Sequence, residues 1–291
     1  MTDGNGQGFG KLWDEAILDP LNKEKMFNLG FLMYKLLMGA DYKSDKSNEH
    51  IIGGFAELLT EAFSKVSDDV LPDLKRSLSY DGAFVEPGIW ESPQFRVFPH
   101  LLLEESLKKG EAQTLLELLM IAHDLEAYVR PNLLRIVWLA KLSTENPTIL
   151  YSFSQLKGDG EQGSIGYGID GMIKWLNSNK SDILSTTEKE ELIQFYTSIG
   201  TRDIPSSLLS ELRNWIVHRD FIMIDGGVII NLHPAESAKR IQATTVQITE
   251  LRRTTLGLAA LLKAFNSMFL ASVVSKVGDI APSFIKPRHR M

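Results

Sequence analysis

The apolar residues of this chain recur at helical spacing over long stretches, and this periodicity limits the fold more than any other feature. In segments 22–40 and 48–66, hydrophobic side chains return every three or four residues, as they do along one face of a helix. Segment 111–128 continues the pattern, and Pro131 stands where a further helix can begin. Strands do not alternate with helices along the chain, so the sequence predicts an all-α helical bundle.

One short region departs from the helical pattern. Runs rich in β-branched residues at 221–224 and 228–232 flank Asp225-Gly226-Gly227, and such a pair of runs around a turn predicts one small β-hairpin. Beyond Pro234 we expect a return to helix, with an apolar stripe from Ile241 to Phe269.

The most apolar long window, 254–274, does not predict a membrane span. Lys263 and Asn266 interrupt it, whereas a span needs about 20 apolar residues in a row. We expect a buried helix here and no membrane association. The acidic, glycine-rich first ten residues do not resemble a signal peptide, and the prediction is a cytoplasmic protein.

Composition excludes several chemistries and places positive charge near the C-terminus. The chain has 291 residues and no cysteine, so disulfides and thiol catalysis are excluded. The formal net charge is −6, and residues 1–150 carry 15 basic against 23 acidic residues, a balance of −8. Residues 210–291 carry 11 against 6, a balance of +5. The basic end of the chain also holds the motif described below, although a charge bias of this size usually reflects only a solvated face.

Glycine-rich and proline-rich segments suggest where the chain divides. Residues 81–99 form one candidate boundary, and residues 157–171 form a second. We predict an N-terminal helical region of unknown role over 1–157 and a second helical domain over 158–291. Within the second loop, Gly158-x-Gly160-x-x-Gly163 matches a dinucleotide fingerprint, but only segment 148–154 before it could be a strand, so a plain loop is the better interpretation.

The histidines give no pattern of metal ligands. His50, His100 and His123 stand apart, without the spacing that brings two ligands to one face of a helix, and we predict no metal site and no cofactor. Motifs of the common serine hydrolases and of Walker-type nucleotidases are also missing from the sequence.

The informative motif is Leu212-Arg213-Asn214-Trp215-Ile216-Val217-His218-Arg219-Asp220. A helical wheel places an apolar face on one arc and Arg213, Asn214, Val217 and His218 on the opposite, outward arc. A histidine titrates near neutral pH and can move a proton, while an arginine can stabilise a charged phosphorane. An asparagine can orient either group. The spacing of Arg213 and His218 alone is weak evidence for a catalytic site, since it also arises by chance in many helices.

The motif in its setting resembles the HEPN superfamily (higher eukaryotes and prokaryotes nucleotide-binding domains). Arg213, Asn214 and His218 match its Arg-x4-6-His motif, and the resemblance covers roughly residues 165–275. It implies an all-α, usually dimeric domain and a metal-independent ribonuclease that forms 2′,3′-cyclic phosphate ends, as in toxin–antitoxin or phage-defence systems. It also implies RNA as partner, a homodimer with a composite site, and an antitoxin or regulatory protein as a further partner.

Site roles follow from the resemblance and from chemistry. His218 would act as general base or acid, Arg213 as phosphate stabiliser and Asn214 as orienter. The outward Val217 would lie in the dimer contact. Arg219, Arg252 and Arg253 are candidates for guiding the RNA backbone, with surface solvation as the alternative.

Two other functions stay open from the sequence. One is a non-catalytic interaction or scaffold protein, and the other is a small-nucleotide sensor that uses the same pocket. Asp220 stands where members modified by a nucleotidyltransferase carry a tyrosine, which argues against that form of regulation.

Overall fold

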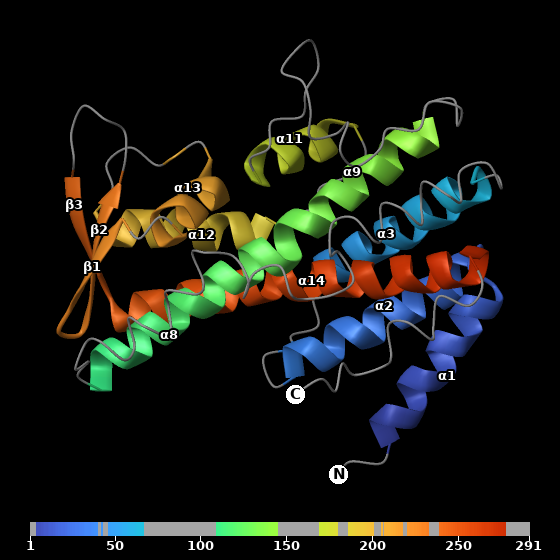
Figure 1. The fold of residues 1–291 in the computed structure, drawn as a ribbon, viewed down its shortest axis with the longest axis horizontal. Coiled ribbons are helices and arrows are strands. Elements are labelled where there is room, and N and C mark those ends of the chain that lie inside the picture. Colours follow the sequence, from blue (N-terminus) through green and yellow to red (C-terminus); the bar gives the residue numbers. More distant parts are fainter. Residues whose placement is uncertain are drawn as a thin grey trace, which may run out of the picture. The chain divides into compact units, whose positions relative to one another are not determined.

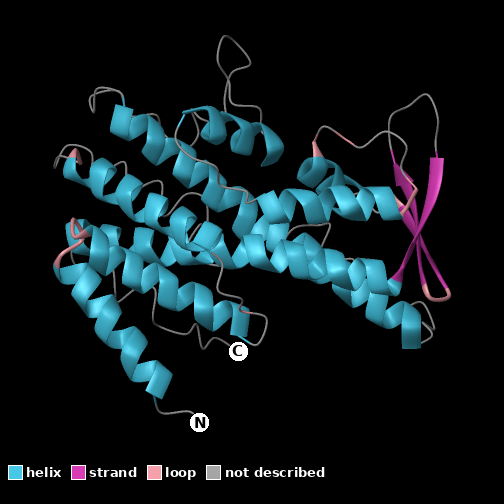
Figure 2. Cartoon of the chain, turned by 180° about the vertical axis from the view of Figure 1, so that it is seen from behind, coloured by secondary structure: helices cyan, strands magenta, loops and turns pink. Residues whose placement is uncertain are grey.

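The computed structural model describes residues 4–39, 42, 46–66, 109–144, 169–179, 186–200, 205, 207–217, 220–232 and 239–277. Of these residues 84% are helical, and one small antiparallel sheet accompanies the helices, as the all-α prediction required (Figures 1 and 2). The helices are α1 (Gly4–Leu18), α2 (Lys23–Met38), α3 (Lys46–Ser64), α8 (Lys109–His123), the π-helical turn η2 (Asp124–Val129), α9 (Arg130–Thr144), α11 (Ile169–Asn179), α12 (Thr186–Ser198), α13 (Leu208–Val217) and α14 (Thr245–Val277).

The described residues group into two compact units that interleave along the chain. Unit 1 contains α1, α2, α3, and the parts of α9 and α14 that begin at Arg135 and Ala260. Unit 2 contains α8, η2, α11, α12, α13, the sheet, and the preceding parts of α9 and α14. The boundary predicted between residues 157 and 158 falls outside the described residues, as do the segments 81–99 and 148–154 and the motif from Gly158 to Gly163.

Unit 1 is built on an apolar, aromatic core. Asn22 caps α2 by accepting from the amides of Glu24 and Lys25, at 3.1 and 3.2 Å, which satisfies two donors that a helix start leaves free. Aromatic rings of α3 and α14 then pack edge to face: Phe55 lies 5.3 Å from Phe265, measured between ring centroids. Local caps therefore set where the helices begin, and ring packing holds them together.

Unit 2 carries the predicted hairpin, extended by a third strand. β1 (Phe221–Ile224) pairs antiparallel with β2 (Gly227–Leu232), and Gly226 adopts a positive φ of 76° in the turn between them. β3 (Lys239–Thr244) then pairs with β2, with Ile230 opposite Ile241. The helix expected at Ile241 is thus wrong, because its alternation of buried and exposed residues follows the sheet period of two.

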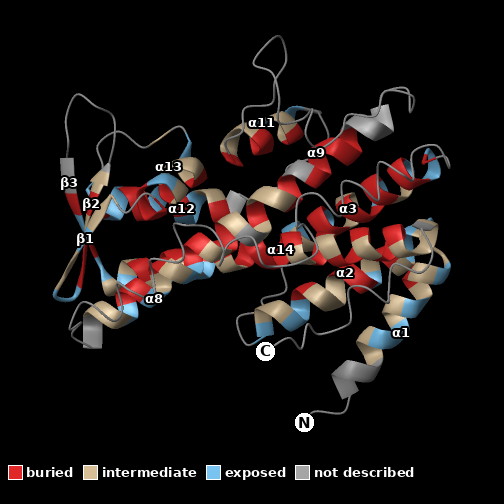
Figure 3. Cartoon of the chain, in the orientation of Figure 1, coloured by how far each residue is buried: buried red, intermediate tan, exposed pale blue. Residues whose placement is uncertain are grey.

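Helix α14 is long and apolar enough to cross a membrane, with a mean hydropathy of 1.6 in its most apolar window. However, 72% of that window is buried within the protein. Figure 3 shows the buried residues distributed along the helix. It therefore looks like the core helix of a soluble protein, as predicted for residues 254–274.

Candidate functional site

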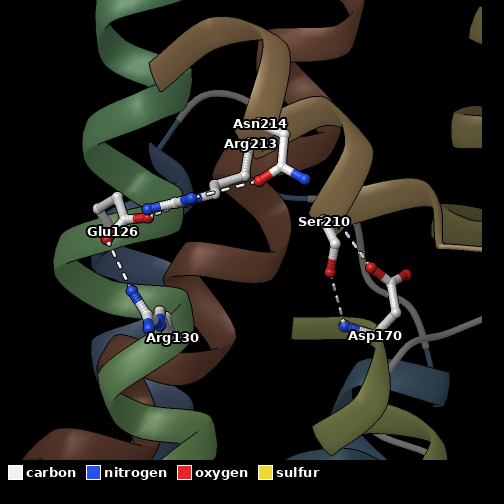
Figure 4. A network of polar contacts seen from close by, with 6 residues as sticks. All are labelled: Glu126, Arg130, Asp170, Ser210, Arg213 and Asn214. Carbon is white, nitrogen blue, oxygen red and sulfur yellow. Dashed lines mark hydrogen bonds and ion pairs between the residues drawn. The ribbon is translucent and has the colours of Figure 1, made fainter. Parts of the chain in front are cut away.

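The start of the motif helix α13 is fixed by a carboxylate from another part of the chain. Asp170 on α11 accepts from the amides of Leu209 and Ser210, at 3.2 and 2.6 Å, and the Asp170 amide donates to the Ser210 hydroxyl at 3.4 Å (Figure 4). A carboxylate suits this position because the amides of a first helical turn lack partners and the helix dipole is positive there. The helix accordingly begins at Leu208.

A buried tyrosine also holds the start of α13. The Tyr196 hydroxyl on α12 donates to the carbonyl of Leu208 at 3.0 Å, and the residue is fully buried. Burial raises the pKa of Tyr196 well above its ordinary value, with a smaller contribution from the negative charge of Glu211. The phenol thus stays neutral and keeps donating to Leu208 in the physiological pH range.

The apolar face of α13 is as predicted, but Val217 is not where the helical wheel placed it. Leu209, Leu212, Trp215 and Ile216 are all buried. Val217, expected on the outward arc, is only 3% exposed. The helix packs against α8, α11 and β2, so elements cover it on more than one side, which a wheel of one isolated helix does not anticipate. Val217 therefore gives no support to a dimer contact.

Arg213 lies at the edge of this face and binds a carboxylate that sequence reasoning missed. Its Nε donates to Oε1 of Glu126 in η2, and its Nη1 donates to Oδ1 of Asn214 at 3.2 Å (Figure 4). The side chain of Arg213 is 22% exposed and that of Glu126 is 16% exposed. Asn214 is exposed. The structure thus brings together two of the predicted catalytic residues, and it adds an acid as their neighbour.

A second arginine reaches the same carboxylate. Arg130 Nη1 lies 3.4 Å from Oε2 of Glu126, one helical turn away. The i, i+4 spacing of Glu126 and Arg130 is visible in the sequence and could have suggested this pair. The contact with Arg213 could not have been inferred in this way, because 87 positions separate it from Glu126.

The π-helical turn holds a further acid–base pair. Asp124 Oδ2 lies 3.2 Å from Nη1 of Arg252 on α14, and their side chains are 3% and 14% exposed. The two atoms are close, but the angles do not make a hydrogen bond, and both remain unsatisfied. Arg252, predicted to guide RNA, is therefore mostly buried against an acid. Arg253, predicted for the same role, is exposed.

The end of α13 leads directly to the remaining motif residues. The helix ends at Val217, and the amide of Asp220 donates to the carbonyl of Trp215 at 2.9 Å. His218 and Arg219 lie outside the described residues, so their predicted roles stay predictions. Asp220 in turn accepts at its carbonyl from the amide of Asn231 in β2, at 2.7 Å, which ties the end of the motif to the sheet.

The acidic side chains of η2 at this site face arginines. Within the described ranges, no three histidine or acidic side chains gather as a metal site would require. Glu126 and Asp124 are instead each paired with arginine. No family model, curated protein or solved structure matches this chain. The chemistry of the site must accordingly be argued from its own residues.

Proposed function

We propose that the chain is a metal-independent endoribonuclease of HEPN type whose site is formed by Arg213, Asn214 and His218. The observation that carries the proposal is the hydrogen bond from Arg213 to Asn214 beside the C-terminal end of α13. This bond orients a guanidinium group and an amide shortly before His218 in the sequence. Those three groups suit phosphoryl chemistry that needs no metal.

The proposed reaction uses the 2′-hydroxyl of RNA as nucleophile. His218 takes the proton from the 2′-oxygen, which attacks the adjacent phosphorus, and the bond to the 5′-oxygen breaks. The leaving oxygen takes up a proton, and the products are a 2′,3′-cyclic phosphate and a 5′-hydroxyl. Arg213 stabilises the negative charge that builds on the phosphorane oxygens, and Asn214 keeps its guanidinium in orientation.

Other parts of the proposal rest on the resemblance alone. They are a homodimer with the site at its two-fold axis, a role in defence or toxin–antitoxin control, and a regulatory protein partner. The proposed cytoplasmic location rests instead on the composition of the first ten residues. Since Val217 is buried in its own chain, the variant V217D would disturb packing and could not report on a dimer. Light scattering of the purified protein at several concentrations measures the dimer directly, and a monomer throughout would remove the composite site.

The test of the enzymatic proposal is cleavage of single-stranded RNA in the presence of EDTA. We expect cleavage by the wild-type protein, none of DNA, and a loss of about 100-fold or more in H218A. The cleavage rate should change its dependence on pH at about pH 6–7, where histidine titrates. The matched control is H50A, since His50 is an exposed histidine on α3.

The ends of the products sharpen the same experiment. Cyclic phosphate ends agree with attack by the 2′-hydroxyl, whereas 5′-phosphate ends or loss of activity with EDTA contradict it. RNA bound but never cleaved, by wild type and H218A alike, would instead support a nucleotide sensor or a scaffold.

A further inference from the structure

Two arginines from different helices converge on one carboxylate in unit 2. Arg213 donates to Oε1 of Glu126, and Arg130 approaches Oε2 at 3.4 Å, so each oxygen of the carboxylate faces its own guanidinium (Figure 4). A phosphate group presents oxygens to a pair of guanidinium groups in the same manner, and arginine favours both anions through its planar set of donors. The carboxylate thus occupies a position that a phosphate could take.

The cluster of Arg130, Arg213 and Glu126 has a net positive charge and can therefore attract an anion. Two guanidinium groups face one carboxylate, so the cluster of Arg130, Arg213 and Glu126 carries a formal charge of +1. The neighbouring pair of Asp124 and Arg252 is neutral and adds nothing to this balance. A phosphodiester also carries one negative charge, so its exchange for Glu126 would leave the two arginines with the same charge balance of +1.

The exposure of the three side chains permits such an exchange. Arg130 is 34% exposed, Arg213 22% and Glu126 16%, so all three have some access to water. Glu126 also lies in a π-helical turn, in which the amide of Arg130 bonds to the carbonyl of Leu125 five residues earlier. Such turns are rare in proteins overall, but many of those known lie at functional sites, where the extra residue shifts side chains from the ordinary helical register.

We propose that Arg130 and Arg213 form a phosphate-binding clamp, and that Glu126 keeps the clamp closed until a phosphodiester displaces it. The inference rests on the proposed function for its ligand, a single-stranded RNA backbone. It adds Arg130 as a binding residue and Glu126 as an internal competitor. The apparent affinity for RNA is then the affinity of the open clamp multiplied by the fraction of molecules in which Glu126 has left the two arginines.

The experiment measures binding to a fluorescent 2′-O-methyl RNA, which cannot be cleaved because its 2′-oxygen is blocked. The variant E126Q removes the negative charge that competes with RNA for the two arginines. The variant E117Q on α8 changes the net charge by the same amount and serves as the control. Glu117 makes no ion pair with the described residues. We expect affinity to rise about tenfold in E126Q relative to E117Q at fixed salt, as for a clamp open one tenth of the time.

A second pair of variants tests the clamp in the opposite direction and does not depend on the folding of E126Q. R130Q should weaken binding more than K174Q, which removes one positive charge from the exposed Lys174 on α11. Equal affinities of E126Q and E117Q, or of R130Q and K174Q, would overturn the clamp.

Parallel cleavage of unmodified RNA separates this proposal from the enzymatic one. A gain in binding by E126Q without cleavage by any variant keeps the clamp and removes the ribonuclease. Cleavage with no gain in binding removes the clamp alone, and no binding by any variant removes both.

Discussion

The two units bury different kinds of side chains. In unit 1 the core is largely aromatic and aliphatic, with Phe55 edge to face against Phe265 and Phe63 against Phe269. Its buried Arg135 donates to Asn266 and lies over the ring of Phe269. In unit 2 two acids of one π-helical turn, Asp124 and Glu126, lie mostly buried against arginines. Aromatic packing stabilises a fold, whereas partly buried ion pairs contribute little net stability. Their presence in unit 2 is more easily explained by a function than by folding.

The largest effect that tests this contrast is expected from F265A in unit 1. Phe265 is fully buried and contacts the rings of Phe55 and Phe269, so its truncation leaves a cavity. We expect a loss of about 3–5 kcal/mol in the free energy of unfolding, measured with urea and circular dichroism. F265L, which keeps most of the volume, should lose clearly less. A loss no greater than that of F265L would show that the aromatic core is not the stabilising element.

A smaller effect is expected when one ion pair of unit 2 is broken. D124N leaves the mostly buried Arg252 without its counter-ion and should lower the free energy of unfolding by roughly 2–3 kcal/mol. The double variant D124N/R252M removes the stranded charge as well, and it should be more stable than D124N alone. A double variant that is no more stable than D124N would mean that the stranded charge of Arg252 is not the cause of the loss, and the contrast between the units would fail.

Much of the fold could be predicted because its signals are local. The helices near residues 23–38, 46–64 and 109–123 were recognisable from the spacing of apolar residues. The hairpin followed from Asp225-Gly226 between β-branched runs. The third strand was missed because Ile241 also fits the helical stripe of the segment after it, and only pairing with β2 makes it a strand.

The candidate site was predictable only in part, for a physical reason. Arg213 and Asn214 are neighbours in sequence, so their contact needs only a helix. Glu126 meets Arg213 through packing of α13 beside η2, and Asp170 caps α13 from another helix. Contacts of this kind depend on tertiary structure and leave no periodic signal. Val217 was misplaced for the same reason, since the sheet and the helices around α13 determine which sides are covered.

The smallest effect concerns an exposed charge in unit 1. The hydrogen bond from Lys25, joined by one from Asn22, holds the pKa of Asp19 below its ordinary value of 3.8. Because the folded pKa lies below the unfolded one, the stabilisation is present above about pH 3.8 and is lost as the pH falls through the folded pKa. D19N should therefore lose a little stability at pH 6 and none at pH 2, as measured by thermal melting at each pH.

A melting temperature of D19N that differs from wild type equally at both pH values would show that the side chain acts through shape alone. Such a result would leave the charge of Asp19 without a role in unit 1.

The interleaved chain has a consequence for synthesis on the ribosome. Helix α3 is made early, but the rings of Phe265 and Phe269 that pack against it follow about 200 residues later in the sequence. At the usual ~5–20 residues per second, the first aromatic residues wait on the order of 10 s or more for their partners. During that interval Phe55 and Phe63 are open to chaperones and to other nascent chains. The aromatic side of α3 thus stays without these ring partners until α14 has been made.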